Sequence, residues 1–357
     1  MPISQTEARN RYTNTLIGFY QQLTTPTGFL RAKFTEDVST TKYVSIDVQR
    51  FGEQVATDVQ RGTEGNMNTF DDNNNKLFLP PYYREKFNAT SMDLYDRALG
   101  SPLIDEGIFA MLVQETAKRM THLQNKIERA YELQAASVYE TGTVTLKDRT
   151  IINFKRKSDS LVNLGAGNYW VNDVDPYKTI EDLCNFLRQV GKMEGGGTVD
   201  VLCGSTAWQD FMNNSYVKAR NDIKMWKLDD VVPPARNIVG GVYHGTVTCG
   251  SYVAHMWTYP EFYDNAQGVS TPYWNPKKIC VTPAQKTNFK LAFAAVPRLL
   301  MGNRQSALLG STTQVSGKYV IGDYTDSRLD SHIFDIKSAG VCIPMDVDRI
   351  ATATVCP

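Results

Sequence analysis

Histidine is the side chain most often used for acid–base catalysis and metal binding near neutral pH, and this chain has only four. His122 falls within a long helical pattern, where a surface or boundary position is expected. His244 and His255 flank a predicted hairpin and could approach each other, but no third ligand or carboxylate stands at a suitable spacing. Neither this pair nor His332 predicts a metal site.

Other residues that could do chemistry also favour ordinary roles. The acid pairs Asp71-Asp72 and Asp229-Asp230 lie in polar segments, where adjacent carboxylates usually face solvent or cap helices. Residues 71–75 are rich in oxygen ligands but lack the glycine and distal glutamate of a calcium loop. Gly195–Gly197 is not followed by the Gly-Lys-Ser/Thr of a phosphate loop. We therefore predict no catalytic, cofactor-binding or metal residue, and a soluble enzyme with no identifiable site remains an alternative.

The six cysteines are scattered, and no two of them form a CxxC pair. Structural zinc and redox sites usually contain such closely spaced pairs. We expect reduced, mostly buried thiols in a protein made in the cytoplasm. The cysteines are Cys184, Cys203, Cys249, Cys280, Cys342 and Cys356.

Composition indicates a globular protein with a substantial core. The 357 residues suit two or three domains, and 42% are hydrophobic against 21% charged. Lys plus Arg and Asp plus Glu both number 38, so the net charge is zero. Tight nucleic-acid binding usually requires a basic excess, so only weak, non-specific contact with DNA is expected. The sequence has neither a signal-peptide pattern nor an apolar run of membrane-spanning length, which predicts no membrane partner.

The main structural prediction is one long amphipathic helix over residues 101–142. Ser101 and Pro102 suit a helix start, and Gly142 suits its end. A helix of this length spans about 50 Å, more than an ordinary core needs, so it should brace something extended. Its apolar positions include Ile127, Tyr131 and Val138. The residues assigned to its solvated face are Lys118, Arg119, Lys126, Glu128, Arg129 and Glu132.

Two segments before this helix lack enough apolar residues to fold alone. Residues 1–38 form an arm, with a short helix predicted over residues 9–22, which should lie across another body. Alternation over residues 43–48 predicts a strand, and an extended apolar run resumes at residues 77–83. The polar, turn-rich stretch between them makes the whole a long hairpin, which needs a partner surface.

After the helix, short strands and helices follow without regular alternation, which predicts an α+β fold. The predicted helices cover residues 177–190 and about 206–211. The predicted strands cover residues 144–146, 151–154, 199–203, 278–281, 332–336 and 350–355, with a strand region at 242–259.

The order of these features resembles the major capsid proteins of tailed double-stranded-DNA bacteriophages, in the lambda-type capsid protein E family. No single motif is diagnostic, and the order along the chain carries the resemblance. The matching segments are residues 26–30 with Phe34, 43–48, 132–145, 152–156, Trp170 with Asp175-Pro176, and 241–263.

The resemblance implies a Hong Kong 97-type capsid fold. That fold has an N-terminal arm, an extended β-hairpin loop over a neighbouring subunit, a peripheral domain with a long spine helix, and an axial domain. The implied divisions are the arm at 1–38, the loop at 39–90, the peripheral domain at 91–175, the axial domain at 176–296 and a C-terminal return to the peripheral domain at 297–357.

The implied function is a structural subunit that forms hexamers and pentamers of an icosahedral capsid around the viral DNA. Implied partners are further copies of the chain, a scaffolding protein, a portal and a decoration protein, with assembly in the host cytoplasm and a final place in the virion. An encapsulin-like compartment that encloses protein is the alternative within the same fold. The candidate inter-subunit contacts are Arg50, Glu53, Arg61 and Glu64 in the extended loop.

Overall fold

The computed structural model describes residues 28–48, 74–90, 106–146, 150–193, 197–222, 240–265, 267–284, 288–299, 312–315, 317–326 and 331–357. These residues fall into two compact units. In its described parts, unit 1 is drawn from Tyr82–Ala130 and Ala295–Ala339. Unit 2 is drawn from Thr27–Pro81, Tyr131–Ala294 and Gly340–Pro357.

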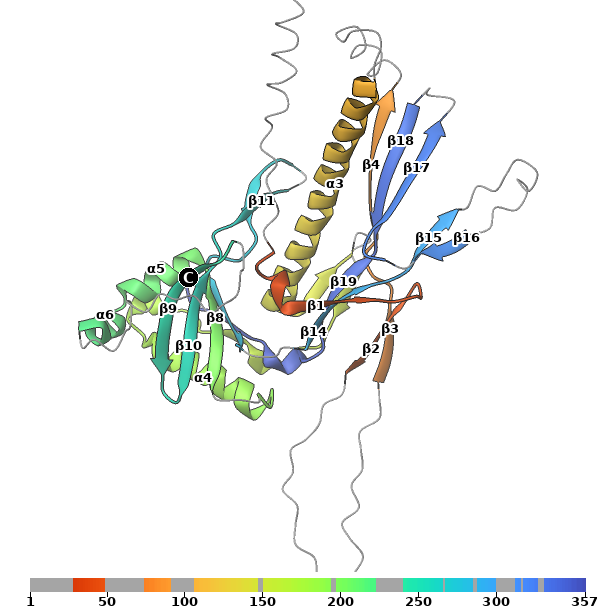
Figure 1. Ribbon diagram of the computed structural model, residues 1–357. Coiled ribbons are helices and arrows are strands. Elements are labelled where there is room, and N and C mark those ends of the chain that lie inside the picture. Colours follow the sequence, from red (N-terminus) through yellow and green to blue (C-terminus); the bar gives the residue numbers. More distant parts are fainter. Residues whose placement is uncertain are drawn as a thin grey trace, which may run out of the picture. The chain divides into compact units, whose positions relative to one another are not determined.

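The long helix is present as α3, Glu106–Thr141, with 36 residues (Figure 1). Its predicted start at residues 101–105 lies outside the described residues, and its predicted end is confirmed. Gly142 has a φ of +70° and donates its N–H to the carbonyl of Val138 at 2.9 Å, an arrangement typical of a helix C-terminus. The helix contributes residues to unit 1 as far as Ala130 and to unit 2 from Tyr131.

Unit 1 contains an antiparallel sheet in the order β17–β18–β4 and the hairpin β15–β16. Asp335 on β18 is 1% exposed, and its carboxylate accepts two hydrogen bonds from Arg84, at 2.9 and 2.7 Å. Lys337 lies 3.3 Å from the same oxygen, so two cations surround this buried acid. The strands are β4 (Tyr83–Thr90), β15 (Val296–Leu299), β16 (Thr312–Val315), β17 (Val320–Asp326) and β18 (Ser331–Ser338).

Glu128 on α3 is buried in unit 1, so its assignment to the solvated face was wrong. It is 8% exposed, lies 3.3 Å from the ammonium of Lys318, and accepts a hydrogen bond from the hydroxyl of Tyr319. Lys126, two positions earlier, is exposed and pairs with Glu85 at 2.8 Å. The prediction of a solvated face therefore holds for one of these two residues.

Unit 2 is built on a six-stranded mixed sheet in the order β7–β20–β13–β8–β10–β9 and a three-stranded sheet in the order β1–β14–β19. The strands of the larger sheet are β7 (Leu161–Asn163), β8 (Thr198–Cys203), β9 (Val242–Cys249), β10 (Tyr252–Thr258), β13 (Lys278–Pro283) and β20 (Ala351–Thr354). Those of the smaller sheet are β1 (Phe34–Val38), β14 (Phe289–Phe293) and β19 (Gly340–Pro344).

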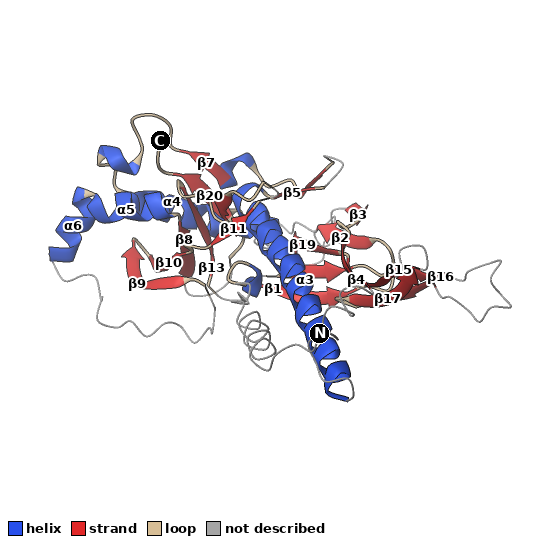
Figure 2. Ribbon diagram, turned by 90° about the horizontal axis from the view of Figure 1, so that it is seen from above, coloured by secondary structure: helices blue, strands red, loops and turns tan. Residues whose placement is uncertain are grey.

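Three antiparallel hairpins and several short helices complete unit 2. The hairpin strands are β2 (Val44–Val48) with β3 (Asn74–Phe78), β5 (Thr143–Thr145) with β6 (Ile151–Asn153), and β11 (Phe262–Asp264) with β12 (Ser270–Pro272). The α-helices are α4 (Pro176–Gln189), α5 (Ser205–Asn213) and α6 (Ser215–Asp222), seen beside the sheet in Figure 2. The 3-10 helices are η1 (Arg31–Lys33), η2 (Ser158–Ser160), η3 (Trp170–Asn172) and η4 (Val347–Arg349).

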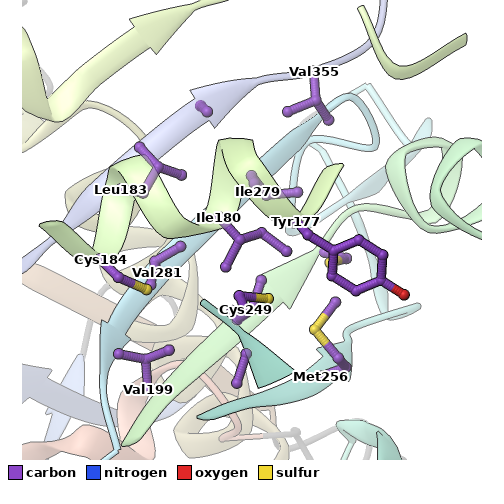
Figure 3. Close-up of a cluster of buried hydrophobic side chains, with 14 of the residues drawn as sticks. Tyr177, Ile180, Leu183, Cys184, Val199, Cys249, Met256, Ile279, Val281 and Val355 are labelled. Carbon is purple, nitrogen blue, oxygen red and sulfur yellow. The ribbon is translucent and has the colours of Figure 1, made fainter. Parts of the chain in front are cut away.

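Helix α4 covers one face of the six-stranded sheet. Asp175 caps its first turn by accepting the N–H of Tyr177 at 3.0 Å, and Pro176 occupies the first helical position. Ile180 and Leu183 recur at helical spacing and point from α4 toward the strands (Figure 3). Alternate residues of three strands meet them: Val199, Val201 and Cys203 of β8, Ala254 and Met256 of β10, and Ile279 and Val281 of β13.

The α+β class predicted from the sequence is confirmed, as are the helices near 177–190 and 206–211. The extended hairpin begins as predicted, because Val44–Val48 pairs antiparallel with Asn74–Phe78; residues 49–73 and the helix predicted at 9–22 lie outside the described residues. Strand β20 lies in the sheet of β8 and β13, whereas β18 pairs with β4 in unit 1. None of the helices in the described ranges combines the length and apolar character needed to cross a bilayer.

The end of α3 leads to a stability prediction. A Cβ on Gly142 would lie 2.4 Å from Cδ of Arg156, in addition to the strain of a side chain at positive φ. Gly165 has a similar φ of +76°, but a Cβ there would meet nothing within 4 Å. We expect Gly165→Ala to lower the free energy of unfolding by about 1–2 kcal/mol, and Gly142→Ala to lower it clearly more. Equal losses in chemical denaturation would contradict this account of the helix end.

Candidate functional site

The four predicted contact residues, Arg50, Glu53, Arg61 and Glu64, lie in residues 49–73, outside the described residues. The structure therefore does not bring them together or separate them. It does fix the strands on either side, since β2 leads into this segment and β3 follows it. Their role as inter-subunit contacts remains a prediction.

His244 and His255 do not form a joint site, contrary to the possibility that they approach each other. Between strands β9 and β10 the register shifts at Met256 and Trp257, which leaves His244 at a β-bulge. His244 stacks on Trp208 with ring centroids 4.2 Å apart, and its Nε2 lies 2.8 Å from the hydroxyl of Thr258. His255 instead lies 3.3 Å from the hydroxyl of Tyr243.

The surroundings of His244, the histidine at the bulge, indicate a structural role. Burial lowers the pKa of His244, which favours the neutral imidazole that stacks on Trp208.

Across the described ranges, no group of three or more His, Cys, Asp or Glu side chains could hold a metal ion. The prediction that the cysteines are free and buried is confirmed for all six, and burial raises the pKa of Cys184 and Cys249 to about 12.

One network of polar contacts in unit 2 holds residues 28–34, which we call the anchor segment. Its η1 turn exposes backbone N–H groups that have no partner within so short a helix. Glu132 of α3 accepts the N–H of Leu30 at 2.7 Å and the N–H of Arg31 at 3.1 Å. A carboxylate from a residue far along the chain thus caps the turn.

Glu132 is fully buried, at 0% exposure, so its assignment to the solvated face was wrong. The hydroxyl of Tyr259 donates to the same carboxylate. Burial raises the pKa of Glu132, and this effect outweighs the hydrogen bonds that favour the charged form. The signal missed in the sequence was a second buried face: Ala136 and Tyr139, four and seven positions further on, are both buried.

Aromatic rings hold the two ends of the anchor segment. Phe29 stacks on Tyr259 at 5.3 Å and tilts against Trp257 at 5.6 Å. Phe34 contacts Tyr139 at 5.7 Å and Phe289 at 5.4 Å. These contacts add buried apolar area and directional ring packing to the polar cap on Glu132.

Lys33, near the C-terminal end of the segment, reaches the sheet face opposite α4. Its ammonium lies 2.7 Å from Asp200 and donates to the hydroxyl of Thr282 at 2.6 Å. Asp200 and Thr282 alternate with the residues of β8 and β13 that face α4, so the strand period places them on this side. A cavity of about 40 Å³ adjoins them, far smaller than the several hundred Å³ of a typical ligand site.

Arg156 ties the end of α3 to the same sheet. Its guanidinium donates to the carbonyl of Tyr139 at 2.8 Å, of Ile350 at 2.9 Å and of Ser160 at 3.0 Å. Burial lowers the pKa of Arg156 to about 10, which leaves it charged at neutral pH. The hydroxyl of Thr352 also donates to Tyr139, at 2.7 Å. These bonds supply partners to the carbonyl group of Tyr139 near the end of α3, so the role of Arg156 is structural: it holds the helix end on the sheet.

The comparisons with known proteins agree with this interpretation. Residues 12–306 match the family described as phage major capsid protein E. A crystal structure assigned as a prophage capsid protein from E. coli CFT073 is similar with a TM-score of 0.59 and 15% identity, over 97% of this chain and 98% of that one. At this identity the likeness concerns the fold alone.

Two more distant likenesses carry no argument of their own. The capsid of Myoviridae phage XM1 is 10% identical with a TM-score of 0.47, over 94% of each chain. The holo-SrpI encapsulin complex from Synechococcus elongatus PCC 7942 is 11% identical with a TM-score of 0.45, over 100% of this chain and 96% of that one. No curated protein matches the chain.

The chain has a mixed α+β fold that matches the Hong Kong 97-type fold of phage capsid structures. The chain belongs to the phage major capsid protein E family, whose profile spans most of its length. It is a structural subunit that builds the capsid shell with copies of itself and is located in the virion, and it is not an enzyme.

The cap on the anchor segment leads to a prediction for Glu132. In Glu132→Gln the amide oxygen can still accept one backbone N–H. The amide NH₂ group, however, is a donor and faces the second backbone N–H, which is then buried without an acceptor. We expect the free energy of unfolding to fall by about 2–3 kcal/mol in denaturant titrations. The matched control is Glu140→Gln on the same helix, because Glu140 is partly exposed and accepts one backbone N–H, from Asn275 at 2.8 Å. A loss no larger than in the control would contradict the role of Glu132.

The raised pKa of Glu132 gives a second prediction, for pH dependence. The folded state binds a proton at this carboxyl more tightly than the unfolded state, whose pKa is near the usual 4.5. The stability gained from this proton is fully present below 4.5 and is lost as the pH rises through the folded-state pKa. The wild type should therefore lose stability relative to Glu132→Gln between pH 4.5 and neutrality. A difference that stays constant over this range would show that the pKa is not raised.

Proposed function

We propose that copies of the chain form hexamers and pentamers that close into an icosahedral shell around double-stranded viral DNA. The observation that carries this proposal is α3, a single 36-residue helix that contributes residues to two compact units. A helix of about 50 Å is longer than either unit's own packing would require. It suits a subunit that must resist deformation within a shell.

In this proposal α3 is the spine of a peripheral domain at residues 91–175, and residues 176–296 form an axial domain at the centre of each capsomer. Residues 1–38 are an arm and residues 39–90 an extended loop, both reaching neighbouring subunits, while residues 28–38 and 83–90 also bind within their own subunit. The antiparallel pairing of β2 with β3 supports the loop, because it brings residues 48 and 74 together at the base of the segment between them. Residues 297–357 are proposed to return to the peripheral domain, except that β20 pairs with β13 of the axial segment.

Arg50, Glu53, Arg61 and Glu64 are the proposed inter-subunit contacts of the loop. Exposed ion pairs contribute about 0–1 kcal/mol each, so their effect depends on repetition around every capsomer. Small increments of this size add up over a shell in which each contact occurs many times. These four residues supply two charges of each sign, which suits pairing between copies.

The remaining partners belong to the same proposal. A scaffolding protein, a portal and a decoration protein would act on the shell, which would assemble in the cytoplasm of the host bacterium. The zero net charge supports weak, salt-sensitive contact with the enclosed genome. Such contact allows DNA to move past the inner wall.

The loop assignment can be tested by deletion. Replacing residues 49–73 with Asn-Gly would join β2 to β3 by a two-residue turn and leave the described strands intact. We expect the subunit to melt cooperatively at nearly the wild-type temperature, because the core of unit 2 is elsewhere. Closed shells should be absent in electron microscopy, whereas wild-type chain prepared in parallel forms them.

Either of two results would change this interpretation. Normal shells from the shortened chain would contradict the loop as an inter-subunit element. Loss of cooperative unfolding would instead place residues 49–73 in the subunit's own core.

A further inference from the structure

We propose that the β11–β12 hairpin of one copy docks on the surface around Ile151 of a second copy. We call residues 261–272 the acidic hairpin, and Ile151, Lys155 and Lys157 the basic surface. The proposal rests on assembly of the shell from copies of this chain, and it adds a contact separate from the extended loop. Both surfaces lie in unit 2, and apart from residue 266 they consist of described residues.

The acidic hairpin exposes apolar side chains beside negative charge. Phe262 and Val269 are each 58% exposed, the highest values among the apolar side chains of this hairpin. Asp264 is exposed and lies two residues from Phe262 on the same strand, hence on the same face. Glu261 adds a second carboxylate, and residues 259–276 contain no lysine or arginine. An exposed aromatic ring whose only charged neighbours in the sequence are acidic favours a basic, partly apolar partner.

Aromatic packing at its base and hydrogen bonds at its tip hold the hairpin in place. Tyr263 packs on Tyr273 at 5.0 Å, Tyr273 on Tyr259 at 5.9 Å, and Tyr259 on Phe29 of the anchor segment. At its tip, the side chain of Asn265 accepts the N–H groups of residues 267 and 269 at 2.9 and 3.0 Å. Figure 1 shows the hairpin projecting from the rest of its unit near the label β11. A preordered projection loses little conformational entropy when it binds.

The basic surface carries the complementary features. Ile151 on β6 is 59% exposed, which matches Phe262 in exposure. Lys155 and Lys157 are exposed, whereas Arg156 between them turns inward to the carbonyls it binds. The backbone of Lys155 has a φ of +54°, and its N–H donates to the side chain of Asn153 at 2.7 Å. This local bond orders the backbone at Lys155, where the chain leaves β6.

A second copy of the chain is the occupant that these observations favour. The chain has no net charge, yet these two exposed patches have opposite charge and similar apolar exposure. Two unlike, complementary patches on identical subunits form a head-to-tail contact, which repeats from copy to copy and can close into rings. A shell requires contacts of this kind.

The direct test reverses the charges. Glu261→Lys with Asp264→Lys, and separately Lys155→Glu with Lys157→Glu, should each reduce the yield of closed shells about tenfold or more, because like charges would then face each other. Combining all four substitutions in one chain restores opposite charges and should recover most of the yield. Shells are counted by electron microscopy after sedimentation, and melting curves check that each variant folds.

Three outcomes would overturn the proposal. The first is normal assembly by either double variant. The second is a combined variant that assembles no better than the double variants. The third is that only binding of a different protein to finished shells is lost, which would assign the hairpin to another partner. If the wild type itself forms no particles under any condition, the shell function fails, and that result is distinct from these three.

Cysteine pairing gives an independent readout, because all six native cysteines are buried. When Phe262→Cys and Ile151→Cys subunits are mixed under assembly conditions and oxidised, disulfide-linked dimers of one subunit of each kind should form. The matched control replaces Ile151→Cys with Val171→Cys, since Val171 is 58% exposed at a different place in the unit, on η3. Assembled particles without the 262–151 crosslink, or with equal crosslinking to position 171, would contradict the contact.

Discussion

The structure of unit 2 depends on one buried carboxylate. Glu132 lies on α3 with no exposed surface, and it accepts the backbone N–H groups of Leu30 and Arg31. Burying a carboxylate is costly unless hydrogen bonds compensate, and removing those bonds would leave both the acid and the two N–H groups without partners. The free-energy cost of breaking these hydrogen bonds therefore holds the anchor segment in one position on the helix. From that position the chain continues into β1, whose parallel pairing with β14 begins at Phe34 and Phe289.

The arm, the extended loop and the acidic hairpin, all proposed to contact other subunits, start from this base. Residues before the anchor segment belong to the proposed arm, and β1 leads through β2 into the extended loop. The acidic hairpin is connected to the same base by rings, from Tyr263 through Tyr259 to Phe29. Contacts between identical subunits are individually weak, so their geometry must be reproducible in every copy. Rigid attachment at the base supplies this reproducibility.

Much of the fold could be predicted from the sequence where a period is regular and local. The stripe of Ile180, Leu183 and Leu187 predicted α4, and the alternation at residues 44–48 predicted β2, because each pattern depends on neighbours within a few residues. Glu132 could not be placed in this way. The last third of α3 is buried on two sides, which is a property of its partners, and a single apolar stripe does not reveal it. The pairing of Phe34 with Phe289 likewise depends on residues far apart in the chain.

Amide hydrogen exchange tests the central claim most directly. If Glu132 fixes the anchor segment in the isolated subunit, the amides of Leu30 and Arg31 should exchange slowly, because both are bonded to a buried acceptor. Their protection should approach that of core amides in β8, and it should fall selectively in Glu132→Gln. Exchange of these two amides at the rate of an unstructured peptide, in a subunit whose β8 amides remain protected, would contradict the account.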